Sequence, residues 1–127
     1  EVVAANPDIF AMRLALARRY VEAGGFWSAL PHYMYVLERE TNAEALTYVG
    51  WMTYASGDVD TGVTLLERSL EVLPGDALTQ WFLANALYFG TGDTAAALPL
   101  LQAVLDTGDA PSEIVAEAER MMAEASS

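Results

Sequence analysis

The sequence predicts an all-α fold built from three helical hairpins and one closing helix, and three observations support this prediction. First, residues 54–76, "YASGDVDTGVTLLERSLEVLPGD", and residues 20–42, "YVEAGGFWSALPHYMYVLERETN", share a glycine-containing break, a helix-like run and a polar or proline stop. Second, residues 77–110 supply a third copy at nearly the same spacing. Third, one stripe at helical spacing holds mostly apolar residues, namely Leu65, Leu66, Ser69, Leu70 and Leu73.

Each copy reads as two helices joined by a tight turn. The first helix is expected at about 8–23, 43–56 and 77–90, and the second at about 27–40, 59–73 and 94–106. The repeats then span about 8–42, 43–76 and 77–110, within a single domain over 1–127. Glycine accepts the positive φ that ends a helix, and Asp or Ser caps the next one.

Residues 111–125, "PSEIVAEAERMMAEA", predict a last helix that starts no fourth copy. Its glutamates face one way, and its apolar stripe faces the other way over Ile114, Val115, Ala118, Met121, Met122 and Ala125. A side that seals the last repeat and a side that faces water are typical of a capping helix in a repeat protein.

Composition excludes several classes of function. The chain has 127 residues, 54% hydrophobic content and a formal net charge of −12, and all six of its cations are arginines. Such a charge repels phosphate backbones and anionic lipid, which argues against nucleic-acid and membrane-surface binding. No apolar stretch reaches the ~18 residues of a membrane span. The chain has no cysteine, so disulfides, thiolate metal sites and thiol nucleophiles are excluded.

Hairpin copies of 33–34 residues resemble tetratricopeptide repeats over about residues 8–110. The family's small positions are met by Ala17, Gly50 and Ala84 in the first helices and by Ala29, Gly62 and Ala97 in the second. In the first helices, the large apolar position directly before the small one holds Leu16, Val49 and Leu83. In the second helices, the family's aromatic knob position holds Tyr33, Leu66 and Leu101. The small position three residues after the knob holds Val36, Ser69 and Val104. The family's tryptophan position departs from the pattern, with Arg13, Leu46 and Gln80. The resemblance implies a right-handed superhelical solenoid with a C-terminal capping helix.

The resemblance also implies which residues line a concave surface. The inward positions are Leu14, Arg18, Thr47, Trp51, Tyr54, Trp81, Asn85 and Tyr88, with Tyr48 and Phe82 beside them. Large aromatic rings bury much area at little rotamer cost, and Asn85 offers an amide to a peptide backbone. The alternative is that these rings pack between helices. Some family members clamp a terminal carboxylate, but the matching positions here hold only one suitable residue, Arg18, so we expect no such clamp.

The sequence shows no catalytic constellation, and we expect no enzyme, no cofactor and no metal site. The lone histidine, His32, has no nucleophile or carboxylate at a recognisable spacing, and we interpret it as a surface or packing residue. The acidic residues Glu38, Glu40 and Glu44 are most simply solvated, and no calcium-loop pattern is present.

We therefore expect a protein–protein interaction module that binds an apolar, aromatic or basic segment of a partner in its concave groove. The alternative is a structural role, in which the same aromatic face closes a homo-oligomer or docks on the rest of a parent protein. The run "EALTYVGWMTYASGD" followed by "QWFLANALYFGTGDTAAALPLL" is similar to the C-terminal repeat domains of membrane-tethered bacterial proteins linked to c-type cytochrome maturation. That resemblance implies a bacterial protein and a tethering segment upstream of Glu1, and it leaves the compartment open.

Overall fold

The computed structural model describes residues 7–126, and every regular element within this range is helical. The helices are α2 (Pro7–Glu22), α3 (Phe26–Leu37), α4 (Ala43–Ala55), α5 (Val59–Val72), α6 (Ala77–Asn85), α7 (Thr94–Asp106) and α8 (Ser112–Ser126). A π-helical turn, η1 (Ala86–Thr91), continues α6 directly. The described residues contain no strand, so the predicted all-α class is confirmed.

The predicted helix ranges agree with the observed ones to within a few residues. The largest difference lies at α3, which ends at Leu37 instead of near residue 40. Just beyond that end, the Arg39 guanidinium donates to the Tyr35 carbonyl oxygen at 3.0 Å and lies 3.5 Å above the Tyr35 ring. The arginine thus satisfies a carbonyl that a further helical turn would have used.

Side-chain caps start four of the helices. In each case the side-chain oxygen accepts a hydrogen bond from the backbone N–H three residues later, and the capping residues are Asn42, Asp58, Asp76 and Asp93. Two of these caps directly follow a glycine with positive φ, Gly57 at 109° and Gly92 at 75°. The glycine–aspartate pairs therefore end one helix and begin the next, as the sequence predicts.

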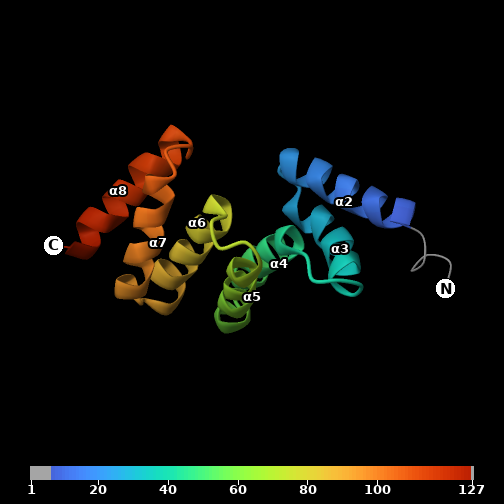
Figure 1. Ribbon diagram of the computed structural model, residues 1–127. Helices are drawn as coiled ribbons and strands as arrows, with labels where there is room; N and C mark the ends of the chain where they lie inside the picture. Colours follow the sequence, from blue (N-terminus) through green and yellow to red (C-terminus); the bar gives the residue numbers. More distant parts are fainter. Residues whose placement is uncertain (1–6, 127) are drawn as a thin grey trace.

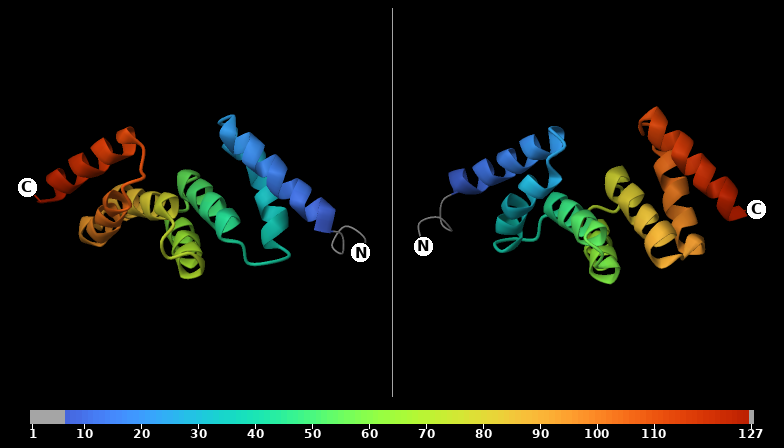
Figure 2. Two further views of the ribbon diagram at one scale, coloured as in Figure 1. Left: turned by 45° about the horizontal axis from the view of Figure 1, so that its top comes forward. Right: turned by 180° about the vertical axis from the view of Figure 1, so that it is seen from behind.

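The helices form antiparallel hairpins that follow one another in chain order (Figure 1). Within the hairpins α2 packs on α3, α4 on α5, and α6 with η1 on α7. Between hairpins α4 packs against α3, α6 against α5, and α8 against α7. As a result α2 and α8 lie at opposite ends of the molecule, which the further views in Figure 2 also show.

Two sets of repeat-equivalent positions on the second helices are buried in every copy. The knob positions Tyr33, Leu66 and Leu101 are each at most 1% exposed, and so are Val36, Ser69 and Val104. The small positions bring helices into close contact. A Cβ at Gly62 would lie 2.7 Å from the Cβ and backbone nitrogen of Tyr54 and 2.8 Å from the Gly50 carbonyl oxygen. Only glycine allows α4 and α5 to approach so closely at this crossing.

The π-helical turn accommodates one extra residue in the third copy. Eight positions separate Ala84 from Gly92, whereas seven separate the equivalent Gly50 from Gly57. A π turn holds one more residue than an α turn, so η1 keeps the flanking helices in register. The widened turn places Gly90 against Tyr54, whose Cε1 would lie 2.7 Å from a Cβ added there.

Candidate functional site

Two adjoining hollows lie beside the start of α6, and Leu78 lines both of them. The first hollow has a volume of about 280 Å³. Its walls come from α2, α4, the α5–α6 connection and α6, through Arg18, Ala43, Glu44, Thr47, Tyr48, Leu73, Asp76 and Leu78. This hollow combines charged groups, an aromatic ring and leucines, so its lining is mixed in polarity.

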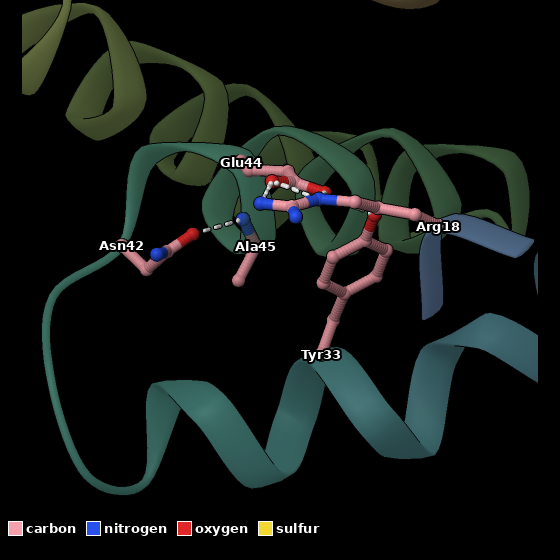
Figure 3. A network of polar contacts seen from close by, with 5 residues as sticks. All are labelled: Arg18, Tyr33, Asn42, Glu44 and Ala45. Atoms are coloured by element: carbon pink, nitrogen blue, oxygen red, sulfur yellow. Dashed lines mark hydrogen bonds and ion pairs between the residues drawn. The ribbon is translucent and has the colours of Figure 1, made fainter. Parts of the chain in front are cut away.

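A polar network forms one wall of the first hollow (Figure 3). Arg18 on α2 grips Glu44 on α4 with two N–H groups, at 2.8 Å from Nη2 to Oε1 and 3.0 Å from Nε to Oε2. From α3 the Tyr33 hydroxyl donates to Glu44 Oε2 at 2.8 Å. One carboxylate therefore ties together the first three described helices, and a fork-shaped pair of this kind is directional as well as charged.

The surroundings of the network raise the pKa values of Arg18, Tyr33 and Tyr48. The hydrogen bond to Glu44 raises the pKa of the Arg18 guanidinium further above neutrality. Burial, followed by the hydrogen bond to Glu44, raises the pKa of the Tyr33 phenol. Burial also raises the pKa of Tyr48, with smaller contributions from the charges of Glu44 and Asp76. At neutral pH the arginine stays charged and both phenols remain hydrogen-bond donors.

The second hollow is smaller and mostly apolar. It has a volume of about 210 Å³ and lies between α6, α7 and the start of α8. Its lining consists of Ala77, Leu78, Trp81, Val104, Asp109, Ala110, Pro111 and Ile114. Only one of these side chains, Asp109, is charged, so the hollow suits an apolar group with a polar or cationic neighbour.

Two of the predicted residues line the hollows with accessible side chains. Arg18 is exposed and lines the first hollow, and Trp81 is half-buried and lines the second. Leu14 instead packs against the core cluster formed by α2, α3 and α4. Asn85 donates its amide to the Trp81 carbonyl oxygen of its own helix, at 2.8 Å. The Tyr88 hydroxyl donates to Glu124 Oε1 on α8 at 3.2 Å.

Thr47, a predicted partner-contacting residue, lines the first hollow, but its side chain is engaged with other helices. It is 2% exposed, and its hydroxyl lies 2.7 Å from the Ser69 hydroxyl and 2.6 Å from the Thr79 hydroxyl. These three hydroxyls come from α4, α5 and α6 and form a buried polar junction. A side chain engaged in this way stabilises the stack of helices and offers no hydrogen bond to a partner.

Trp51 and Tyr54 belong to a row of rings between α4 and α6. Trp51 stacks on Phe82 with centroids 4.4 Å apart, and its ring lies 5.3 Å from that of Tyr54. Tyr48 meets the other side of this row, 6.1 Å from Phe82 and 5.2 Å from Tyr33. The rings are half-buried and pack mainly on one another, which matches the alternative that the sequence left open for them.

The residues that sequence reasoning missed are those whose neighbours come from another hairpin. Glu44 was interpreted as a solvated acid, but it pairs with Arg18 and lines the first hollow. Ile114 was assigned to the sealing face of the last helix, and it lines the second hollow together with Pro111. Leu78 lines both hollows and is absent from the predicted partner-contacting set.

His32 packs against two residues of α2. Its ring stacks on Tyr20, with centroids 5.7 Å apart, and its Nδ1 lies 3.4 Å from Arg13 Nη1. Burial, and then the charge of Arg13, lower the pKa of His32. Within residues 7–126 no group of three or more His, Asp or Glu side chains is arranged to hold a metal ion. No helix in the same range is long and apolar enough to cross a membrane.

No protein-family model matches the chain, and no curated protein is significantly similar to it.

Proposed function

We propose that this chain is a tetratricopeptide-like solenoid with a right-handed superhelical path, and that it binds a segment of a partner protein across the two hollows around Leu78. The observation that carries this proposal is that two hollows of different polarity adjoin at one residue. The hairpin order, the small residues at helix crossings and the capping position of α8 support the solenoid part of the proposal.

The size of the hollows favours side chains over a small molecule as the ligand. Small-molecule sites usually enclose about 300–1,000 Å³. The two hollows have volumes of about 280 and 210 Å³, and neither is enclosed on all sides. Each is therefore suited to a single anchoring side chain, and a partner segment that crosses Leu78 would place one side chain in each.

The chemistry of the walls indicates which segment fits. Trp81, Val104 and Ile114 offer an apolar contact in the second hollow. In the first hollow Glu44 is already neutralised by Arg18, whereas Asp76 adds a further carboxylate to the wall. With a net charge of −12 around these walls, a segment that combines a large apolar residue with a basic one gains the most.

A peptide-display selection tests this proposal. Peptides recovered on the wild-type chain are titrated against Leu78→Glu and against the matched control Val72→Glu, whose site on α5 is 45% exposed. We expect Leu78→Glu to weaken binding at least tenfold, about 1.4 kcal/mol, because it puts a charge between both hollows. Val72→Glu should leave the affinity unchanged. Equal loss in both variants, or no loss in either, would overturn the proposed site.

A second variant guards against misfolding of Leu78→Glu. Ile114→Ala removes one wall of the second hollow and leaves the first intact. It should weaken peptides with a large apolar anchor and spare those without one. The resemblance to repeat domains linked to cytochrome maturation makes C-terminal peptides of apocytochromes the first defined probes. Failure of those peptides alone would remove the pathway proposal and leave the interaction module standing.

A further inference from the structure

One face of α2 is exposed where its counterparts in the later hairpins are buried. The repeat register pairs Met12 with Ala45 and Thr79, and Arg19 with Met52 and Ala86. The four counterparts are at most 3% exposed, because α3 covers α4 and α5 covers α6. Met12, in contrast, is 60% exposed, and Arg19 is exposed too.

The exposed face of α2 is also hollowed. A depression of about 300 Å³ is lined by Leu16, Arg19, Tyr20 and Ala23. Leu16 is half-buried, while its counterparts Val49 and Leu83 are 6% and 4% exposed. The face thus has the composition and shape of a helix-packing surface, and among the described residues no helix packs there as one does in the other two copies.

The charges of the helices point to the occupant. Arg13, Arg18 and Arg19 make α2 the only described helix with a net positive charge. Arg18 is paired with Glu44, and Arg13 lies over the Tyr35 ring. The basic residue on the exposed face is therefore Arg19. At the other end of the molecule, α8 carries four glutamates and one arginine, which makes it the most negative described helix. The two helices lie at opposite ends (Figure 1), and of the described helices only α3 packs closely along α2 and only α7 packs closely along α8.

The outer face of α8 complements α2 in shape as well as in charge. Ala118 and Met121 bury the inner face of α8 against the α6–α7 hairpin. The outer face is exposed and is formed by Glu113, Ala116, Glu119 and Ala123, which share one side of the helix because they are three or four residues apart. Alanines allow a close approach, so Met12 and Leu16 of a second molecule would pack over them while Arg19 meets a glutamate.

We propose that this protein associates head to tail, with the exposed face of α2 in one copy packed on the outer face of α8 in a second copy. The contact joins two different faces, so each dimer keeps one free α2 and one free α8 and can extend. A single helix pair buries less than the ~1,600 Å² of a standard interface, so the association is weak and grows with concentration. The partner that covers the exposed face of α2 is therefore a second copy of this chain. This contact does not depend on whether a peptide is bound in the two hollows beside α6.

Sedimentation velocity between about 10 µM and 1 mM, at 0.15 M salt where the Debye length is about 8 Å, tests the contact. Met12→Glu blocks the α2 face by opposing the α8 glutamates, and Ala116→Arg blocks the α8 face by opposing Arg19. Both sites are exposed, so the fold is retained. Met34→Glu, the same substitution at a 45% exposed site on α3, is the control.

The wild type and Met34→Glu should form species that grow beyond a dimer as the concentration rises, while each blocked variant stays monomeric. An equimolar mixture of Met12→Glu and Ala116→Arg should form a heterodimer and nothing larger, because one unblocked face of each kind remains. A wild type that is monomeric at 1 mM would overturn the proposal. A mixture that stays monomeric, or self-association abolished by Met12→Glu but not by Ala116→Arg, would also overturn it.

Discussion

Gly62→Ala is the sharpest test of how the hairpins are held together. The added Cβ would lie 2.7 Å from the Cβ and backbone nitrogen of Tyr54 and 2.8 Å from the Gly50 carbonyl oxygen. All three atoms belong to the helix framework, so none can move aside as a flexible side-chain end would. Overpacking of this kind costs about 1–3 kcal/mol, and here we expect the upper end of that range.

Helix propensity acts in the opposite direction, because alanine is favoured over glycine in a helix interior by about 1 kcal/mol. The net expectation is a loss of about 2 kcal/mol in the free energy of unfolding. With an unfolding entropy of about 2.1 cal/mol/K per residue, this corresponds to a Tm about 7 °C lower for a chain of this length. Urea unfolding followed by far-UV circular dichroism, with thermal unfolding beside it, measures both quantities.

Two glycines provide matched comparisons for Gly62. At Gly50 the added Cβ meets Leu65 Cβ and Leu66 Cγ at 3.1 Å, so Gly50→Ala should cost less than Gly62→Ala. Around Gly75 no atom lies within 4 Å of an added Cβ and φ is not positive, so Gly75→Ala should be neutral or slightly stabilising. If Gly62→Ala proves as stable as Gly75→Ala, the close crossing of α4 and α5 is not what the structure implies.

Three further predictions follow from the polar contacts. Glu44→Ala should lower the free energy of unfolding by about 1–3 kcal/mol, because it leaves the buried Tyr33 hydroxyl unsatisfied. Arg18→Ala should lower it by less than about 1 kcal/mol, because the Arg18 side chain is 57% exposed. Equal losses of the two variants in urea unfolding would contradict this expectation. Thr47→Val should lower stability by about 1–2 kcal/mol and leave peptide affinity unchanged, and a drop in affinity would return Thr47 to the binding surface. The pKa of His32 is lowered in the fold, so its contribution to stability is complete above about pH 6.5 and is lost as the pH falls below that value. His32→Gln should therefore show a smaller loss of stability than the wild type between pH 7.5 and 5.5, and identical pH dependences would refute the assignment.

The helical hairpins could be predicted because each boundary is encoded within a few residues. The pairs Gly57-Asp58 and Gly92-Asp93 combine a positive-φ end with a capping carboxylate, and both functions depend only on local backbone geometry. The close helix crossing at Gly62 could also be predicted, because a Gly or Ala that recurs at the same repeat position indicates that two helices approach closely there. The π-helical turn could be placed only through the extra residue in the third copy, since nothing in "ALYFGT" itself specifies it.

The candidate site could be predicted only in part, because equivalent residues meet different neighbours at each junction between hairpins. Three residues meet at each junction. One stands on the first helix of a hairpin, three positions before its small residue. The second is a buried residue of the second helix, and the third is the third residue of the helix that follows. The three sets are Leu14, Val36 and Ala45; Thr47, Ser69 and Thr79; and Trp81, Val104 and Ile114. The repeat register identifies eight of these nine positions from the sequence, and the ninth, Ile114, lies in the last helix, which starts no fourth copy.

The outcome at each junction nevertheless depends on whether its three side chains fit together. In the first junction a leucine, a valine and an alanine pack as an apolar core. In the second, three hydroxyls replace them and bond to one another, which turns Thr47 inward. In the third, Trp81, Val104 and Ile114 line a hollow of about 210 Å³. A position predicted to face the groove therefore becomes part of the core, of a polar junction or of an apolar hollow, depending on two residues that lie more than twenty positions further along the chain.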